Sequence, residues 1–243
     1  MRNLIRADIS RVLKRPLVYV ALITSLLAYL FSFEMTIANE FVNSASYLSG
    51  IKKAMDNSGL IFIITIAVFI AVFSNELKAK SMQVVIGHGL TRGKLIAAKF
   101  LDGIIIVCLY FIVFTAVGLL ALYSSGNAAS DQAQMVLRYT WMCAYRIGGY
   151  VIFSAAIMFL TSSTSLGVIA AVAFSLLVDS IMSLIDELTE VRFFDYTFDG
   201  LINEALLRVD AHLFGWQVIP AFLYIAFALA LTIFFFNRKE FEF

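Results

Sequence analysis

Long apolar runs alternate with short polar segments along the chain, and this alternation predicts the fold. Six runs are long enough to cross the hydrocarbon core of a bilayer as helices, which takes about 20 mostly apolar residues. They cover residues 17–37, 58–74, 100–123, 139–160, 164–185 and 215–236. The pattern therefore predicts an all-α, polytopic membrane protein with six transmembrane helices, in which residues 1–243 form one domain.

The polar segment before the first run has the spacing of an amphipathic helix. Its apolar residues fall on one helical face and most of its charged residues on the others. The apolar face consists of Leu4, Ile5, Ile9, Val12 and Leu13. We expect residues 1–15 to form a helix in the membrane interface, with Pro16 at the break before the first crossing. Such a helix serves as an anchor or takes part in gating, and the sequence fits both roles.

Two of the polar connections lie on the predicted outer side and one on the inner side. Residues 38–57 and 124–138 are predicted to be polar connectors. Residues 161–165 are predicted to be a tight link, so that the fourth and fifth crossings form a helical hairpin.

The outer segment 186–214 is longer and acidic, and from Phe198 onward its apolar residues have helical spacing. We expect a short amphipathic helix over residues 198–210 at the outer interface, with its apolar face toward the hydrocarbon. That face consists of Phe198, Leu201, Ile202 and Leu206.

Composition and charge agree with a membrane protein. Hydrophobic residues make up 61% of the chain and charged residues 14%, unlike a soluble domain, and the formal net charge of +1 gives no reason to expect a nucleic-acid partner. The predicted inner basic residues are Arg2, Arg6, Arg11, Lys14, Arg15, Lys78, Lys80, Arg92, Lys94, Lys99, Arg238 and Lys239, and the outer ones are Lys52, Lys53, Arg138, Arg192 and Arg208. This asymmetry predicts that both termini are cytoplasmic.

The segment between the second and third crossings, residues 75–99, is too long and too structured for a simple turn. Glu76 opens a predicted surface helix with an apolar stripe on one side. The stripe consists of Leu77, Met82, Val85 and Ile86. Gly87 and Gly89 end this helix, and Thr91 is a good N-cap for the next one. A surface helix with an apolar stripe and basic residues beside it is suited to docking in a groove of a soluble partner.

This segment resembles the cytoplasmic coupling segment of ABC-2-type ABC transporter permeases. Glu76 follows the second crossing, the run Gly89-Leu90-Thr91-Arg92-Gly93-Lys94-Leu95 comes next, and Lys99-Phe100 opens the third crossing. The closing residues 237–243, NRKEFEF, also resemble the short tail common in that family. The order of elements is similar too, with a basic N-terminal helix, six crossings and an outer helical segment before the last crossing.

The resemblance implies the membrane subunit of an ATP-driven exporter in the bacterial plasma membrane. Two such permeases, identical or different, pair and bind two copies of an ABC ATPase made as a separate chain, which holds ATP and Mg²⁺. The residues implied to couple to the ATPase are Glu76, Leu77, Met82, Val85, Ile86, Gly87, Gly89, Thr91, Arg92 and Lys94. The implied substrate is hydrophobic or amphipathic, with peptides as one candidate class.

The chain itself lacks a nucleotide-binding motif. Its nearest approach is the run GHGLTRGKL at residues 87–95, where His88 stands at the position of the required glycine and Leu95 replaces the hydroxyl that binds magnesium. The two histidines are predicted on opposite sides of the membrane, which argues against a metal site. We therefore expect no enzyme activity, cofactor or metal in this chain.

Two charged residues fall deep within predicted crossings. Arg146 in the fourth crossing and Asp179 in the fifth each cost about 2.5–3.5 kcal/mol to insert. Both lie roughly 10 Å below the outer surface, on helices joined by a tight link. We predict that they form an intramembrane ion pair, with a substrate contact or a proton relay as the alternative role.

Two other functions remain open from the sequence. A gradient-driven secondary transporter would show inverted repeats, broken helices or several carboxylates near the midplane, and the sequence predicts none of these. A membrane-embedded sensor or enzyme without transport is the second alternative.

Overall fold

The computed structural model describes residues 2–38, 44–74, 91–124, 130–189, 192–207 and 218–238, and all regular structure in these ranges is helical. The first half contains α1 (Arg2–Leu13), α2 (Pro16–Ala38), α3 (Ser44–Met55), α4 (Ser58–Phe73) and α6 (Arg92–Ser124). The second half contains α7 (Ser130–Thr161), α8 (Thr164–Val172), α9 (Val178–Thr189), α10 (Phe198–Leu207) and α11 (Val218–Arg238), with a π-helical turn η1 (Ala173–Leu177) and a 3₁₀ turn η2 (Phe194–Tyr196). The predicted all-α class is confirmed.

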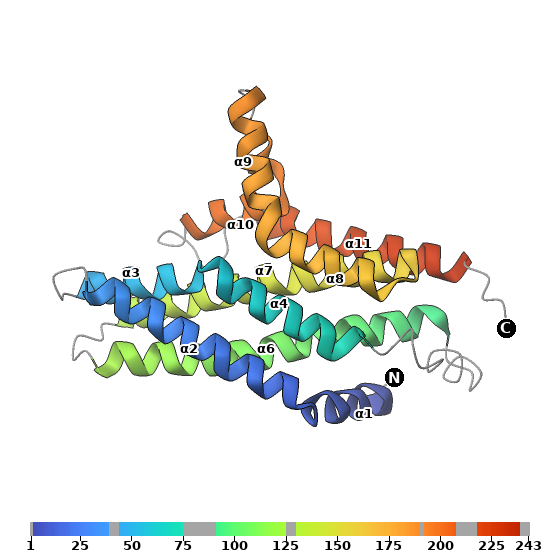
Figure 1. Ribbon diagram of the computed structural model, residues 1–243, viewed down its shortest axis with the longest axis horizontal. Helices are drawn as coiled ribbons and strands as arrows, with labels where there is room; N and C mark the ends of the chain where they lie inside the picture. Colours follow the sequence, from blue (N-terminus) through green and yellow to red (C-terminus); the bar gives the residue numbers. More distant parts are fainter. Residues whose placement is uncertain are drawn as a thin grey trace.

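The long helices lie side by side along one axis, and α9 stands out across it (Figure 1). Helix α7 is the central element, because it contacts α3, α4, α6, α8, α10 and α11. Helix α1, the end of α4, the start of α6 and the end of α11 all lie toward one end of the bundle, on the right in Figure 1. Helix α3, the end of α6 and the start of α7 lie toward the other end.

Among the described residues, α2, α6, α7 and α11 are long and apolar enough to cross a membrane. Helices α8 and α9 add a fifth candidate if they count as one bent span. Helix α4 is apolar but has 16 residues, about 24 Å of helix against a hydrocarbon core of about 30 Å. The helices support a membrane protein, and each of the six predicted crossings coincides with an apolar helix or a bent helix pair.

The fifth predicted crossing is broken rather than straight. Its two parts, Thr164–Leu177 and Ser180–Thr189, are bent by 58° at a break that directly follows the π-helical turn η1. There the N–H of Val178 bonds to the carbonyl of Ala173, five residues back, and the Ser175 hydroxyl donates to the carbonyl of Ala171 at 2.7 Å. π-Turns and inserted side-chain hydrogen bonds are established causes of sharp helix kinks. The expectation that no crossing is broken is therefore wrong.

Both predicted outer connectors contain helix. Helix α3 occupies most of residues 38–57 and buries Ile51, Ala54 and Met55 against the bundle. Their spacing of three and four residues is typical of a helix, but the polar residues around them made the segment look like a loop. The prediction of a connector over residues 124–138 was wrong in part, because α7 already begins at Ser130.

A helix is present in this segment as predicted, α10, but its apolar face points the other way. Phe198, Leu201 and Ile202 are buried inside the protein instead of facing hydrocarbon. The Phe198 ring packs against Phe153 at 5.1 Å between centroids and against Tyr145 at 5.9 Å, both on α7. Helix α10 is therefore part of the packed bundle. The side chain of Leu206 and residues 208–210 lie outside the described residues.

Adjacent glycines on α7 meet different surroundings. A Cβ added at Gly149 would lie 2.2 Å from Cζ of Phe198, so only glycine lets α10 approach this closely. A Cβ added at Gly148 would meet nothing within 4 Å. Gly149 is thus a packing position for α10, whereas Gly148 faces open space.

We predict that Gly149→Ala lowers the stability of the protein in detergent by about 1–3 kcal/mol, because the methyl group displaces Phe198. Gly148→Ala is the matched control and should leave the thermal unfolding temperature unchanged or raise it slightly, since alanine favours helix. Equal unfolding temperatures for the two variants would show that α10 does not pack on α7 in this way.

Candidate coupling site and buried ion network

Most of the predicted coupling residues lie outside the described part of the chain, which omits residues 75–90. These are Glu76, Leu77, Met82, Val85, Ile86, Gly87 and Gly89. Thr91, Arg92 and Lys94 are described, and they stand where the sequence predicted the second helix to begin. The carbonyl of Thr91 accepts the N–H of Leu95 at 3.1 Å, as expected of the residue that precedes a helix. Arg92 Nη1 reaches the carbonyl of Asn237 near the end of α11, at 3.5 Å.

A buried ion pair joins α1 to α6. Lys99 Nζ lies 2.6 Å from Oδ2 of Asp8, and the Lys99 side chain is only 3% exposed. Arg11 of α1 adds a second, more exposed contact to the same carboxylate at 3.2 Å. A buried ammonium is stabilised by a nearby carboxylate, so this ion pair favours the packing of α1 on α6.

Arg15 joins the N-terminal region to α4. Its Nη1 donates to the carbonyl of Ala71 at 2.7 Å and approaches that of Ile70 at 3.4 Å. These carbonyls belong to the last turn of α4, where the helix dipole attracts positive charge. The carbonyl of Ile70 also accepts the N–H of Ser74 at 3.3 Å. Arg15 therefore caps α4 through its side chain.

Asp8, Lys99 and Arg15 together form what we call the α1 tie. The α1 tie connects the helix that enters residues 75–90, α4, with the helix that leaves them, α6. From the sequence, Lys99 and Arg15 were basic residues of the predicted inner side, and Lys99 was also part of the resemblance to ABC-2 permeases. The patterns do not identify their partners, because Asp8 and Lys99 are 91 residues apart.

A second network surrounds Arg146, which is 5% exposed within α7. Its guanidinium lies 3.9 Å from Oδ1 of Asp199 on α10 and 3.8 Å from Oδ1 of Asp56, which follows α3. It also donates a hydrogen bond to Asn203, again on α10. Tyr150, one turn further along α7, donates its hydroxyl hydrogen to Asp199. The network thus fastens α10 and the end of α3 onto α7.

The predicted pairing of Arg146 with Asp179 stays a prediction, because the side chain of Asp179 lies outside the described residues. The carboxylates that do contact Arg146, Asp56 and Asp199, come from segments that were predicted to be loop or outer surface. Their apolar neighbours gave a signal of burial, but nothing in the sequence related them to Arg146.

The two carboxylates differ in surroundings. Asp199 is 2% exposed, whereas the side chain of Asp56 is 42% exposed. Burial raises the pKa of Asp56 above its ordinary value, although Arg146 and Lys52 act to lower it. The cost of desolvating the Asp56 carboxylate is therefore larger than the stabilisation that Arg146 and Lys52 give to its charge. Asp199 is consequently the main counter-ion that holds Arg146 in place.

A cleft of about 770 Å³ adjoins this network. It lies among α7, η1, α9, α10 and α11, on the side from which α9 bends away. Aromatic rings line it, and Asp199 and Tyr150 supply polar groups. The rings include Phe153, Phe174, Phe193, Tyr196, Tyr224 and Phe227. Such a mainly apolar cleft with a few polar groups has the character of a small-molecule site.

Comparison with protein-family models and with curated proteins finds no match for the chain. Within the described ranges, no three His, Cys, Asp or Glu side chains are placed to hold a metal ion together.

We predict that Asp8→Asn lowers stability in detergent by about 3 kcal/mol, because Lys99 is then buried without its carboxylate. The double variant Asp8→Leu with Lys99→Met should recover most of this loss. Arg11→Gln is the control, since its exposed contact with Asp8 contributes less than about 1 kcal/mol. Thermal unfolding followed by circular dichroism measures all three, and an Asp8→Asn variant as stable as Arg11→Gln would contradict the α1 tie.

Asp199→Asn and Asp56→Asn should differ in their effects on the stability of the protein. Removing the Asp199 charge should destabilise the protein by about 2 kcal/mol or more, because Arg146 loses its buried counter-ion. Asp56→Asn should be no less stable than the parent at neutral pH. A raised folded-state pKa makes ionised Asp56 a cost that grows as pH rises through that pKa. Asp179→Asn belongs in the same series, and a loss as large as that of Asp199→Asn would support the predicted pair with Arg146.

Proposed function

We propose that this chain is the membrane-spanning subunit of an ATP-driven exporter of the ABC-2 permease type. In this proposal six crossings place both termini in the cytoplasm of a bacterium. Two permease subunits pair, and two copies of a separate ABC ATPase dock on residues 75–99. ATP and Mg²⁺ bind to the ATPase, and the chain described here hydrolyses nothing.

The observation that carries the proposal is the α1 tie. A segment that receives force from a soluble motor has to pass it to more than one helix. Asp8 of α1 pairs with Lys99 of α6, and Arg15, in the turn that follows α1, donates to the end of α4. The two helices that flank residues 75–90 are therefore both held by the N-terminal segment. A displacement of residues 75–90 would therefore move α4 and α6 together with α1. This favours a gating role for α1 over simple anchoring.

The arrangement of the helices gives further support. The ends of α4 and α11 and the start of α6 gather on the side where α1 lies (Figure 1). The resemblance to the coupling segment of ABC-2 permeases falls on that side, and α6 begins at Arg92 within the matching run. The ring-lined cleft between α9 and α11 suits a hydrophobic or amphipathic substrate, with peptides as one class.

A gradient-driven secondary transporter is the second candidate. The 58° break between α8 and α9 favours it. Discontinuous helices are a feature of that class of transporter. The two candidates differ in their source of energy, which an experiment can separate.

We predict that the tagged chain, purified from its own host in a mild detergent, brings down a nucleotide-binding protein. Met82→Asp with Val85→Asp should release that protein without lowering the unfolding temperature, because the changes affect only the docking stripe. Ser81→Asp with Gln83→Asp is the matched control with the same added charge, and it should retain the partner.

Reconstituted vesicles decide between the two candidates. Substrate uptake that needs ATP and persists when ion gradients are collapsed supports the exporter. Uptake that follows an imposed ion gradient without any nucleotide would count against it, and so would a Met82→Asp with Val85→Asp variant that keeps its partner.

A further inference from the structure

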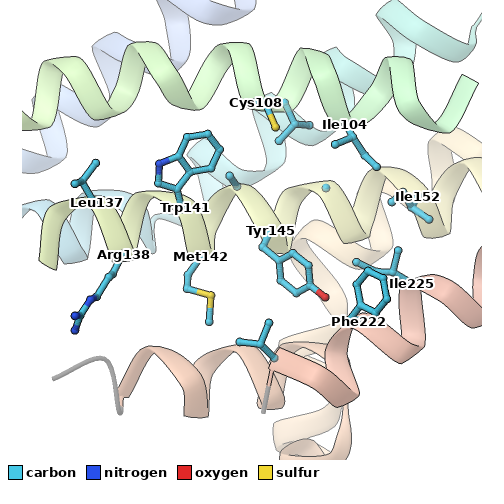
Figure 2. Close-up of a pocket in the computed structure, with 14 residues that line it drawn as sticks. Ile104, Cys108, Leu137, Arg138, Trp141, Met142, Tyr145, Ile152, Phe222 and Ile225 are labelled. Atoms are coloured by element: carbon cyan, nitrogen blue, oxygen red, sulfur yellow. The ribbon is translucent and has the colours of Figure 1, made fainter. Parts of the chain in front are cut away.

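An apolar groove between α6, α7 and α11 takes no part in the coupling site, the ion network or the ring-lined cleft. Its volume is about 480 Å³, within the range of sites for a single small ligand. Along α7 it runs from Leu137 to Ile152, roughly 22 Å of helix. Its walls include Ile104 and Cys108 of α6, Trp141 of α7, and Phe222 and Ile225 of α11 (Figure 2).

Two polar side chains of α7 line this groove. Arg138 lies near the end of the groove that belongs to the predicted outer side (Figure 2). Tyr145 lies two turns further in, and its hydroxyl is directed toward Phe222 (Figure 2). That hydroxyl is buried and has no hydrogen-bond partner among the described residues. A buried donor without an acceptor is costly, so its presence calls for a bound group.

The wall also opens onto the backbone of α7. Gly148 lines the groove, and a Cβ added there would meet nothing within 4 Å. The space beside the neighbouring Gly149 is filled by the ring of Phe198, so the open space at Gly148 is local to the groove. A substitution at Gly148 can therefore fill the groove without disturbing α10.

We propose that this groove binds one anionic glycerophospholipid of the outer leaflet. Its phosphate lies at Arg138, an ester carbonyl accepts the Tyr145 hydroxyl, and an acyl chain follows the apolar wall toward Ile104 and Ile152. This is the order in which such a lipid presents its charged group, its esters and its hydrocarbon. Trp141 lies just inside Arg138, at the depth where tryptophan is enriched in membrane proteins.

A lipid fits the groove better than a peptide does. A peptide carries an N–H and a C=O at nearly every residue, and each would need a partner in a wall that is apolar apart from Arg138 and Tyr145. A glycerophospholipid has its polar atoms at one end only. The inference needs no ATPase and goes beyond the proposed export function.

The test is native mass spectrometry of the full chain, delipidated in detergent and titrated with phosphatidylglycerol or with phosphatidylcholine of the same acyl chains. We expect one lipid per chain to bind tightly, with phosphatidylglycerol preferred. Arg138→Gln should abolish that preference, a loss of about tenfold in affinity for the anionic lipid. Arg192→Gln, which removes an exposed arginine on the same predicted side, is the matched control and should keep it.

Two further variants probe the groove itself. Gly148→Leu should weaken binding of both lipids at least about tenfold while leaving thermal stability unchanged or higher, because it fills open space. Leu120→Phe, which adds bulk on an exposed face of α6, should bind as the parent does. Tyr145→Phe should weaken binding about two- to tenfold.

Three results would overturn the proposal. The first is equal affinity for the two lipids in the parent protein. The second is the same lipid preference in Arg138→Gln as in Arg192→Gln. The third is a Gly148→Leu variant that unfolds or binds lipid unchanged, which would mean that protein, from this chain or a second copy, already occupies the groove.

Discussion

The architecture depends on placing one positive charge inside an apolar helix. Arg146 lies on the central helix of the bundle, where an isolated guanidinium would cost several kcal/mol. Its contacts with Asp199, Asn203 and Asp56 offset that cost. Asp199 and Asn203 belong to α10, and Asp56 directly follows α3. The packing of α10 and of the end of α3 on α7 is therefore organised around this charge. Helix α10 packs inward because its polar side has to meet Arg146, and its apolar side then covers α7.

This inward packing sets the shape of what surrounds it. Phe198 takes the space above Gly149, and the rings of Tyr150, Phe153 and Phe174 gather around Phe198 and one another. Since α10 occupies this position on α7, the preceding helix, α9, runs away from the bundle. The π-turn after α8 provides that departure, with α9 directed away from the long axis. The ring-lined cleft is the space between the departing helix and α11.

The sequence predicted what depends on local pattern. Runs of about 20 apolar residues located the long apolar helices, and Thr91 marked the start of α6 correctly. The sequence reading missed α3, because six apolar residues among polar ones read as a loop, and it gave α10 the wrong orientation. An amphipathic helix fits lipid and protein equally well, and only the position of Arg146 decides between them. The partners of Lys99, Arg15 and Arg146 were missed for the same reason, since each is distant in sequence.

The long separation in the α1 tie also bears on how the protein is made. Asp8 leaves the ribosome 91 residues before Lys99. At about 5–20 residues per second, that interval lasts roughly 5–20 s. During this time α1 has no ammonium from α6 to hold it, and α2 and α4 are synthesised before it is fixed. Helix α1 is thus made well before it reaches its final contacts, so the α1 tie is complete only after α6 begins.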